Sequence, residues 1–202
     1  MTNQDNLIFR LERIYAAVGA SKEVDLSKVP PQVVVSSKGF AIFQDFRGGL
    51  SDADLANIVH SMIQNIAGLK DHVKEWLEKK GIDPQKMFDH IYKSDGLMIC
   101  LDLWNREKHP NLKRSYSKKF PKLENVNRVL LLTTKAEKGS AVVMQLTPKG
   151  LEQTAGSGSS EVVVTGDVVD NQGNKLGDIQ RFASEAVQAW EDFLRSHGVS
   201  LR

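Results

Sequence analysis

The chain has 202 residues, of which 41% are hydrophobic and 26% are charged, and its formal net charge is +2. These values suit one globular domain, or one domain with an appended layer, and they require that any attraction for nucleic acid come from a local basic patch. With one cysteine, no signal-peptide pattern and no apolar run of the roughly 20 residues that span a bilayer, the sequence excludes an internal disulfide and predicts a cytoplasmic protein without a membrane partner.

Helical periodicity marks the first part of the chain, with one interruption. Apolar residues recur at helical spacing over residues 5–18, and Gly19 ends this amphipathic helix. The Pro30–Pro31 pair then breaks regular structure. Residues 33–46 combine a run of valines with three phenylalanines spaced by three. This pattern predicts a short strand followed by a helix whose phenylalanines lie in the core.

The longest predicted helix begins at Ser51 and ends at Gly81. Ser51 is an N-cap residue with Asp54 three positions later, and Gly81 supplies a C-cap. Apolar residues form one wide face along this helix, so it requires a partner. A short helix is expected within residues 84–93. We predict that the next helix, over residues 97–108, packs antiparallel to the long one as a helical hairpin.

From residue 125 onward the periodicity changes to that of strands. The segments VNRVLLLTT and SAVVMQLT, joined by KAEKG, predict a β-hairpin, and EVVVTGDVVD predicts a third strand with a bulge or bend at Gly166. The Gly- and Ser-rich residues 148–160 predict a flexible loop. Asp178 begins a C-terminal helix that covers the resulting three- or four-stranded antiparallel meander.

The predicted fold class is therefore α+β. A helical part over residues 1–122, built on a long antiparallel helical hairpin, is followed over residues 123–202 by a small antiparallel β-meander packed on a C-terminal helix. We expect the two parts to form one compact unit.

One edge of the 97–108 helix carries side chains that suit catalysis. At about 100° per residue, Asp102, Asn105 and His109 fall on one stripe, and Pro110 stops the helix. His109 can act as base or acid near neutral pH, and Asn105, one turn earlier, can orient its ring. A second interpretation is that His109 only interacts favourably with the helix dipole. These three residues form the candidate catalytic set.

The long helix has a polar edge of its own. Asn65 and His72 flank its apolar face, and Gly68 in the same sector predicts the close approach of a neighbouring backbone. In an antiparallel pair, this edge can face the Asp102 edge, with Asn65 and His72 in a supporting role. Two interpretations fit these residues: boundary polar groups that form interhelical hydrogen bonds, or the walls of a functional cleft.

A basic stretch, KHPNLKRSYSKKFPK, follows the helix. Cations with interleaved aromatic residues suit phosphate contacts and base stacking on single-stranded nucleic acid, and the alternative is a solvated loop. The residues that we expect to bind nucleic acid are Arg106, Lys108, Lys113, Arg114, Tyr116, Lys118 and Lys119.

Other chemistries find less support in the sequence. Asp71, His72, Asp102 and His109 carry metal-ligand groups, but the chain has no H-x-x-x-H pair, no HExxH and no second cysteine. The GxxxxGK[ST], GxGxxG and GxSxG motifs are absent as well. We predict neither a metal site nor a cofactor.

The segments LKDHVKEWL and DLWNREKH resemble a group of uncharacterised bacterial proteins that share D-(L/I)-x-N-x-x-K-H, and these in turn resemble the HEPN superfamily. That superfamily consists of helical proteins, among them RNA-cleaving toxins and defence factors. Its signature is an arginine, often followed by a polar residue, and a histidine four to six residues after the arginine. Over residues 51–110 the resemblance matches His109 to the histidine and Asn105 to the polar position. Trp104 stands in place of the arginine, which is expected to contact the scissile phosphate.

Two functional hypotheses follow. The resemblance and the basic stretch imply an RNA-associated protein in bacterial defence or stress, which binds single-stranded RNA with little or no nuclease activity because Trp104 replaces the arginine. If the protein is an enzyme, the resemblance implies a metal-independent ribonuclease. The alternative is a non-enzymatic protein-interaction module, in which the polar helix edge is structural and the partner is another protein or a second copy of the chain.

Overall fold

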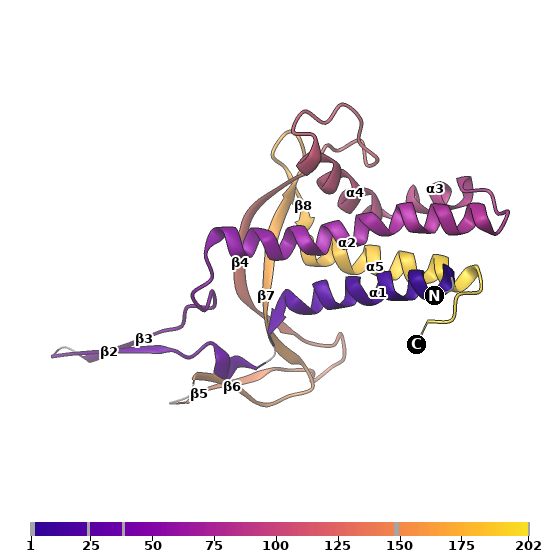
Figure 1. Ribbon diagram of the computed structural model, residues 1–202. Coiled ribbons are helices and arrows are strands. Elements are labelled where there is room, and N and C mark those ends of the chain that lie inside the picture. The colour runs from indigo at the N-terminus through magenta and orange to yellow at the C-terminus, as the bar shows by residue number, and fades with distance from the viewer. Residues whose placement is uncertain (1–2, 24, 38, 148–149, 202) are drawn as a thin grey trace.

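A computed structural model describes residues 3–23, 25–37, 39–147 and 150–201 of the chain (Figure 1). Each of its α-helices coincides with a segment for which the sequence predicts a helix. None of the helices within the described residues combines the length and the apolar character that crossing a membrane requires. The helices are α1 (Asn3–Ala20), α2 (Asp52–Lys79), α3 (Gln85–Ile91), α4 (Asp95–Lys108) and α5 (Ile179–Ser196), with a short 3-10 helix, η1 (Leu26–Lys28).

Local side-chain bonds define where the helices begin. At α2, the Asp54 amide donates to the Ser51 hydroxyl and the Ser51 amide donates to the Asp54 carboxylate, which completes a capping box. The side chains of Ser94 and Asp178 cap α4 and α5 by accepting a hydrogen bond from the amide three residues later, without the return bond of a capping box. Just beyond α2, Gly81 has a φ of 68°, in the left-handed region that favours glycine.

The main sheet is antiparallel and is built around one central strand. β7 (Ser159–Val169) pairs with β4 (Lys122–Thr133) along one edge, and with β1 (Lys22–Glu23) and β8 (Lys175–Asp178) at different points along the other. Three consecutive valines in the middle of β7 are buried, so both faces of the strand are covered there. α5 packs on β7. The predicted α+β fold, with a C-terminal helix on antiparallel strands, is thereby confirmed.

One predicted strand pairing is wrong. The sequence predicts a hairpin between β4 and the segment that forms β5 (Val143–Thr147), but β4 pairs with β7, and β5 pairs with β6 (Gly150–Ala155). β6 also occupies part of the segment predicted to be a flexible loop; residues 148–149 of that segment lie outside the described residues. The physical reason is burial. β7 offers β4 a long valine-rich partner, an option that the local hairpin pattern does not reveal.

The predicted bulge at Gly166 is present. The register between β4 and β7 shifts between Glu124 and Asn127, opposite this glycine. A Cβ atom at Gly166 would lie 3.1 Å from the Glu124 carbonyl oxygen, so the absence of a side chain lets the two backbones approach.

In the segment for which the sequence predicts a strand and then a helix, the structure has two paired strands. β2 (Gln32–Ser36) and β3 (Gly39–Phe43) pair antiparallel and project from the helical body, toward the same side as β5 and β6 (Figure 1). A threefold spacing repeated only twice does not outweigh the strand preference of consecutive valines. Phe43, which the sequence places in a core, is 59% exposed. The side chain of Phe40 lies outside the described residues.

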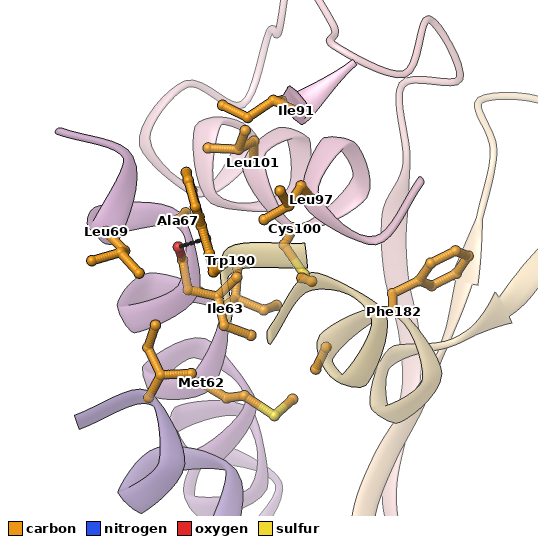
Figure 2. Close-up of a cluster of buried hydrophobic side chains, with 14 of the residues drawn as sticks. Met62, Ile63, Ala67, Leu69, Ile91, Leu97, Cys100, Leu101, Phe182 and Trp190 are labelled. Atoms are coloured by element: carbon orange, nitrogen blue, oxygen red, sulfur yellow. Dashed lines mark hydrogen bonds between the residues drawn. The ribbon is translucent and has the colours of Figure 1, made fainter. Parts of the chain in front are cut away.

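One hydrophobic core joins the helices to the sheet. Figure 2 shows helical side chains of this core. Trp190 of α5 is fully buried, and its indole Nε1 donates to the Ile66 carbonyl of α2 at 3.0 Å. The core extends from Leu7 in α1 to Val164 in β7. Residues from both predicted parts of the chain, 1–122 and 123–202, therefore contribute to the same core.

α4 returns along α2, as the predicted helical hairpin requires (Figure 1). Its Leu101 is buried against the core, whereas Trp104, one turn later, is half-buried. α4 also packs closely on α5 through Gly96. A Cβ atom there would lie 2.7 Å from both the Ala186 amide nitrogen and the Phe182 carbonyl oxygen. α4 is therefore held between α2 and α5, which fixes the position of the segment that follows it.

Candidate nucleic-acid interface

The carboxylate of Asp102 organises the basic loop that follows α4. Asp102 is fully buried and accepts four hydrogen bonds from this loop. The donors are the Tyr116 amide and the Ser115 hydroxyl, both at 2.6 Å, and the amide and hydroxyl of Ser117, at 2.9 and 2.6 Å. Several charge-assisted bonds offset the cost of withdrawing a carboxylate from water. Residues 115–117 are therefore fixed against the helix.

Further bonds fasten the rest of the loop. The Phe120 amide donates to the Ser115 hydroxyl at 3.3 Å, and the Arg106 guanidinium donates to the Phe120 carbonyl at 3.0 Å. Lys118 and Phe120 have φ values of 60° and 50°, a left-handed conformation that is uncommon for residues other than glycine. Such conformations cost free energy and persist where surrounding contacts over-determine them. The contacts with Asp102 and Arg106 supply that constraint.

Asp102 thus lies apart from the other two candidate catalytic residues. Its carboxylate is buried beneath the loop, and its four bonds hold backbone and hydroxyl groups of that loop. The shared helical stripe predicts that Asp102, Asn105 and His109 face one site, but Asp102 lies in the buried part of α4, Asn105 is half-buried and His109 is exposed. The role that the structure shows for Asp102 is to hold the loop.

His109 is the C-cap residue of α4 and is exposed. Its amide donates to the Asn105 carbonyl at 2.9 Å. Its φ and ψ of −135° and 86° lie outside the helical region, as expected for a residue that precedes a proline. Asn105 is half-buried, and no side-chain hydrogen bond joins it to His109 among the described residues. The imidazole is therefore available to solvent but is not oriented by Asn105.

The predicted nucleic-acid-binding cations of the loop fall into two groups. Lys113, Arg114 and Lys118 are exposed. Lys119 instead forms an ion pair with Asp95 at the start of α4, with Nζ 3.4 Å from the carboxylate oxygen. Arg106 is half-buried and donates a hydrogen bond to the loop backbone. The first group presents charge to an external partner, whereas the second fastens the loop to α4.

Aromatic side chains border the same loop. The ring centroid of Tyr116 lies 6.0 Å from that of Tyr92, which is 55% exposed. Lys70 of α2 lies over the Tyr116 ring, with its Nζ 5.9 Å from the centroid. Exposed cations beside an aromatic pair can serve both the phosphates and the bases of a single strand. We use the term basic-aromatic surface for Tyr92, Lys113, Arg114, Tyr116 and Lys118.

Asn65 and His72 line a different cavity, a pocket of about 250 Å³ between α1, α2 and α4. Trp104 and Lys108 are the α4 residues in its wall, and Asn105 and His109 are not. The two polar edges that the sequence predicts to face each other are therefore not brought together. The pKa of His72 is lowered, first by burial and then by the positive charge of Arg10 on α1.

Another pocket, of about 570 Å³, lies between α2, α4 and the start of β4. Its wall holds His60 and Glu107, whose Nδ1 and Oε1 lie 3.4 Å apart. The sequence does not single out this pair, because it lies on two helices whose register is fixed only by packing. The one available signal is that each residue lies one turn from an apolar neighbour in the same wall, Ile63 or Leu103.

The metal-binding alternative has no geometric counterpart. Across the described ranges, no three His, Cys, Asp or Glu side chains gather as metal ligands do, and the set of Asp71, His72, Asp102 and His109 does not converge. Burial raises the pKa of the Cys100 thiol to about 12, so this thiol stays protonated near neutral pH.

Comparison of the chain with known protein families, with curated proteins and with solved structures gives no match. The resemblance to the HEPN superfamily therefore rests on the two short motifs alone. Any functional conclusion has to come from the geometry of the basic-aromatic surface and the pockets beside it.

Proposed function

We propose that the protein binds single-stranded RNA in the cytoplasm through the basic-aromatic surface and does not cleave it. The observation that carries this proposal is the Asp102 anchor, which fixes a loop whose Lys113, Arg114 and Lys118 side chains are exposed. A buried carboxylate is a desolvation cost that a simple solvated connection does not require. In a binding loop, the same anchor orders the backbone before the partner arrives.

This pre-ordering favours binding in a specific way. Ordering a loop upon association consumes part of the interaction free energy, and a loop already fixed by hydrogen bonds avoids that loss. The exposed cations then contact phosphates, and the exposed ring of Tyr92, which lies beside the half-buried Tyr116, is available for base stacking. Phosphate contacts and stacking are both tolerant of sequence, so we expect weak base preference.

The absence of cleavage follows from what catalysis requires. Attack by a ribose 2′-hydroxyl needs a base that takes its proton and a cation that stabilises charge on the phosphate. His109 is exposed and can act as the base, but the position of the HEPN arginine holds Trp104, half-buried against the core. The neighbouring Arg106 is engaged with the Phe120 carbonyl. The two groups are therefore not assembled around one phosphate.

Fluorescence anisotropy with a labelled single-stranded RNA tests the proposal. We expect wild-type binding at low salt, with log K falling against log salt at a slope of about −2 if three cations contact phosphates. A variant that combines Lys113→Glu, Arg114→Glu and Lys118→Glu should lose binding. The matched control combines Lys86→Glu, Lys135→Glu and Lys138→Glu, which make the same charge change at exposed positions outside the loop.

Two results would overturn the proposal. One is no detectable binding of wild-type protein to single-stranded RNA at low salt. The other is equal loss of binding in the loop variant and the control variant, which would show that net charge alone is responsible. Thermal unfolding of both variants establishes that each remains folded.

A second candidate function is self-association through the projecting hairpins. The β2–β3 hairpin exposes Val34, Val35 and Phe43, and an isolated two-stranded hairpin is only marginally stable in water. A second copy of the chain would supply matching apolar strands. Sedimentation velocity over a range of concentrations tests this candidate: a concentration-dependent dimer that Val35→Lys abolishes supports it, and a monomer at all concentrations contradicts it.

A further inference from the structure

Three cations converge on the pocket between α1, α2 and α4. Arg10 and Arg13 reach it from α1, and Lys108 reaches it from the last turn of α4, with its Nζ 4.4 Å from the centroid of the Trp104 ring. Neither arginine has an ion-pair partner anywhere in the described part of the chain. Arginines that line a concave site without carboxylate partners leave their charge available to a ligand.

The Arg10 guanidinium also has a buried hydrogen-bond donor without an acceptor among the described residues. Its Nε atom is buried, and no described residue accepts a hydrogen bond from it. A guanidinium N–H that is withdrawn from water without an acceptor is unfavourable, because the group loses its hydration and gains nothing in return. An oxygen-rich anion in the pocket would supply the missing acceptor.

The charge balance of the pocket wall favours an anion. Its charged residues are three cations, Arg10, Arg13 and Lys108, and a single carboxylate, Asp71. The Asp71 carboxylate also lies 3.6 Å from the Lys70 ammonium, so part of its charge is compensated outside the pocket. The other polar residues of the wall are Gln64, Asn65 and His72.

Gly68 makes room for a ligand. The sequence predicts that this glycine allows a neighbouring backbone to approach, but a Cβ atom there would meet no atom within 4 Å. Gly68 instead lines the pocket in the middle of α2. Glycine is unfavourable inside a helix, and packing does not require it at this position. Open space beside unpaired arginines is the arrangement that a bound group would need.

We propose that this pocket binds a phosphate group. Arg10 and Arg13 offer planar, bidentate donors to its oxygens, and Lys108 offers a point charge from the opposite wall. The site stands on residues other than those of the basic-aromatic surface, so it does not depend on RNA binding there. Its ligand is a phosphate ester, either a free small molecule or the terminal phosphate of an RNA strand.

Isothermal titration calorimetry with inorganic pyrophosphate at low ionic strength tests the site. We expect binding by the wild type, and at least a tenfold rise in Kd for Arg10→Gln and for Arg13→Gln. Lys86→Gln is the matched control, because it removes the same charge from an exposed residue on α3. Gly68→Leu should also abolish binding, since it fills the pocket without any change of charge.

Two oligoribonucleotides that differ only in a 5′-phosphate or a 5′-hydroxyl identify the source of the phosphate. Tighter binding of the phosphorylated strand that is lost in Gly68→Leu assigns the pocket to an RNA end. Binding of pyrophosphate without that preference assigns it to a free phosphate ester. The proposal is overturned if neither probe is bound, or if Arg10→Gln and Gly68→Leu bind as the wild type does. The loop charge-reversal variant should retain pyrophosphate binding, which separates this test from that of the proposed function.

Discussion

Trp190 and Val35 mark the two extremes of packing in this molecule. Trp190 is fully buried where α5 meets α2, whereas Val35, in the β2–β3 hairpin, is 78% exposed. In the core, each position is fixed by contacts between segments that lie far apart in the chain. In the hairpin, pairing between neighbouring strands is the main constraint. Free energy of folding should therefore be concentrated in the core and in the groups that are tied to it.

The basic loop shows how an exposed segment can share the order of the core. Its charged side chains face outward like those of any surface loop, but Asp102 connects its backbone to a buried helix. By contrast, no described side chain of β2 or β3 belongs to the buried core. The loop thus combines exposure with fixed geometry, which is what a binding surface requires.

The largest effect is expected from Trp190→Ala. This change leaves a cavity between α2 and α5 and removes the donor to the Ile66 carbonyl. We expect the free energy of unfolding to fall by about 3–5 kcal/mol, as measured by urea denaturation. A loss below about 1 kcal/mol would show that this tryptophan is not central to the core.

Asp102→Asn should have the next largest effect. In asparagine, an NH2 group replaces one of the two accepting oxygens. That group would face the amide of Tyr116 or Ser117, so two hydrogen-bond donors would meet without an acceptor. We expect a loss of about 2 kcal/mol, together with faster tryptic cleavage after Lys113 and Arg114 as the loop loosens. Unchanged stability and unchanged cleavage would contradict the role of Asp102 as an anchor.

Gly68→Ala should change stability in the opposite direction. A methyl group at this position meets no atom within 4 Å, and alanine is a better helix former than glycine. We expect the free energy of unfolding to rise by up to about 1 kcal/mol. Gly96→Ala is the control, because the same change there produces contacts of 2.7 Å with α5 and should destabilise the protein.

The smallest effect is expected from Val35→Thr in the hairpin. The two side chains are similar in shape, and the position is largely exposed, so we expect a change within about 0.5 kcal/mol. The measurement is the same urea denaturation. A loss comparable to that of Trp190→Ala would show that the hairpin is coupled to the core after all.

The elements that the sequence predicts correctly are those with a local signal. The N-cap at Ser51 and the apolar face of the C-terminal helix α5 are each visible within one helix, and both are present. The hairpin partner of β4 is not a local property, because β7 lies in a later part of the chain. The helix predicted in the second half of residues 33–46 fails for a different reason, because the spacing of three phenylalanines is a weaker signal than consecutive valines, and Phe43 is exposed.

In the candidate site, too, local features can be predicted from the sequence, whereas features that depend on packing cannot. The loop cations and Tyr116 can be identified from the sequence alone, and the structure leaves Lys113, Arg114 and Lys118 exposed. The burial of Asp102 cannot be read in this way, since a helical stripe does not show which part of a helix enters the core. The convergence of Arg10 with Lys108 is likewise invisible, because it depends on how α1 and α4 pack on α2.

The central claim is that the protein binds single-stranded RNA without cleaving it. A labelled RNA incubated with saturating wild-type protein and then resolved on a denaturing gel, with and without chelator and beside His109→Ala, tests this directly. We predict that the RNA is recovered intact in every lane, because Trp104 stands at the position of the HEPN arginine and the neighbouring Arg106 is bonded to the Phe120 carbonyl. Cleavage that survives chelator and disappears in His109→Ala would contradict the account and identify an active metal-independent ribonuclease.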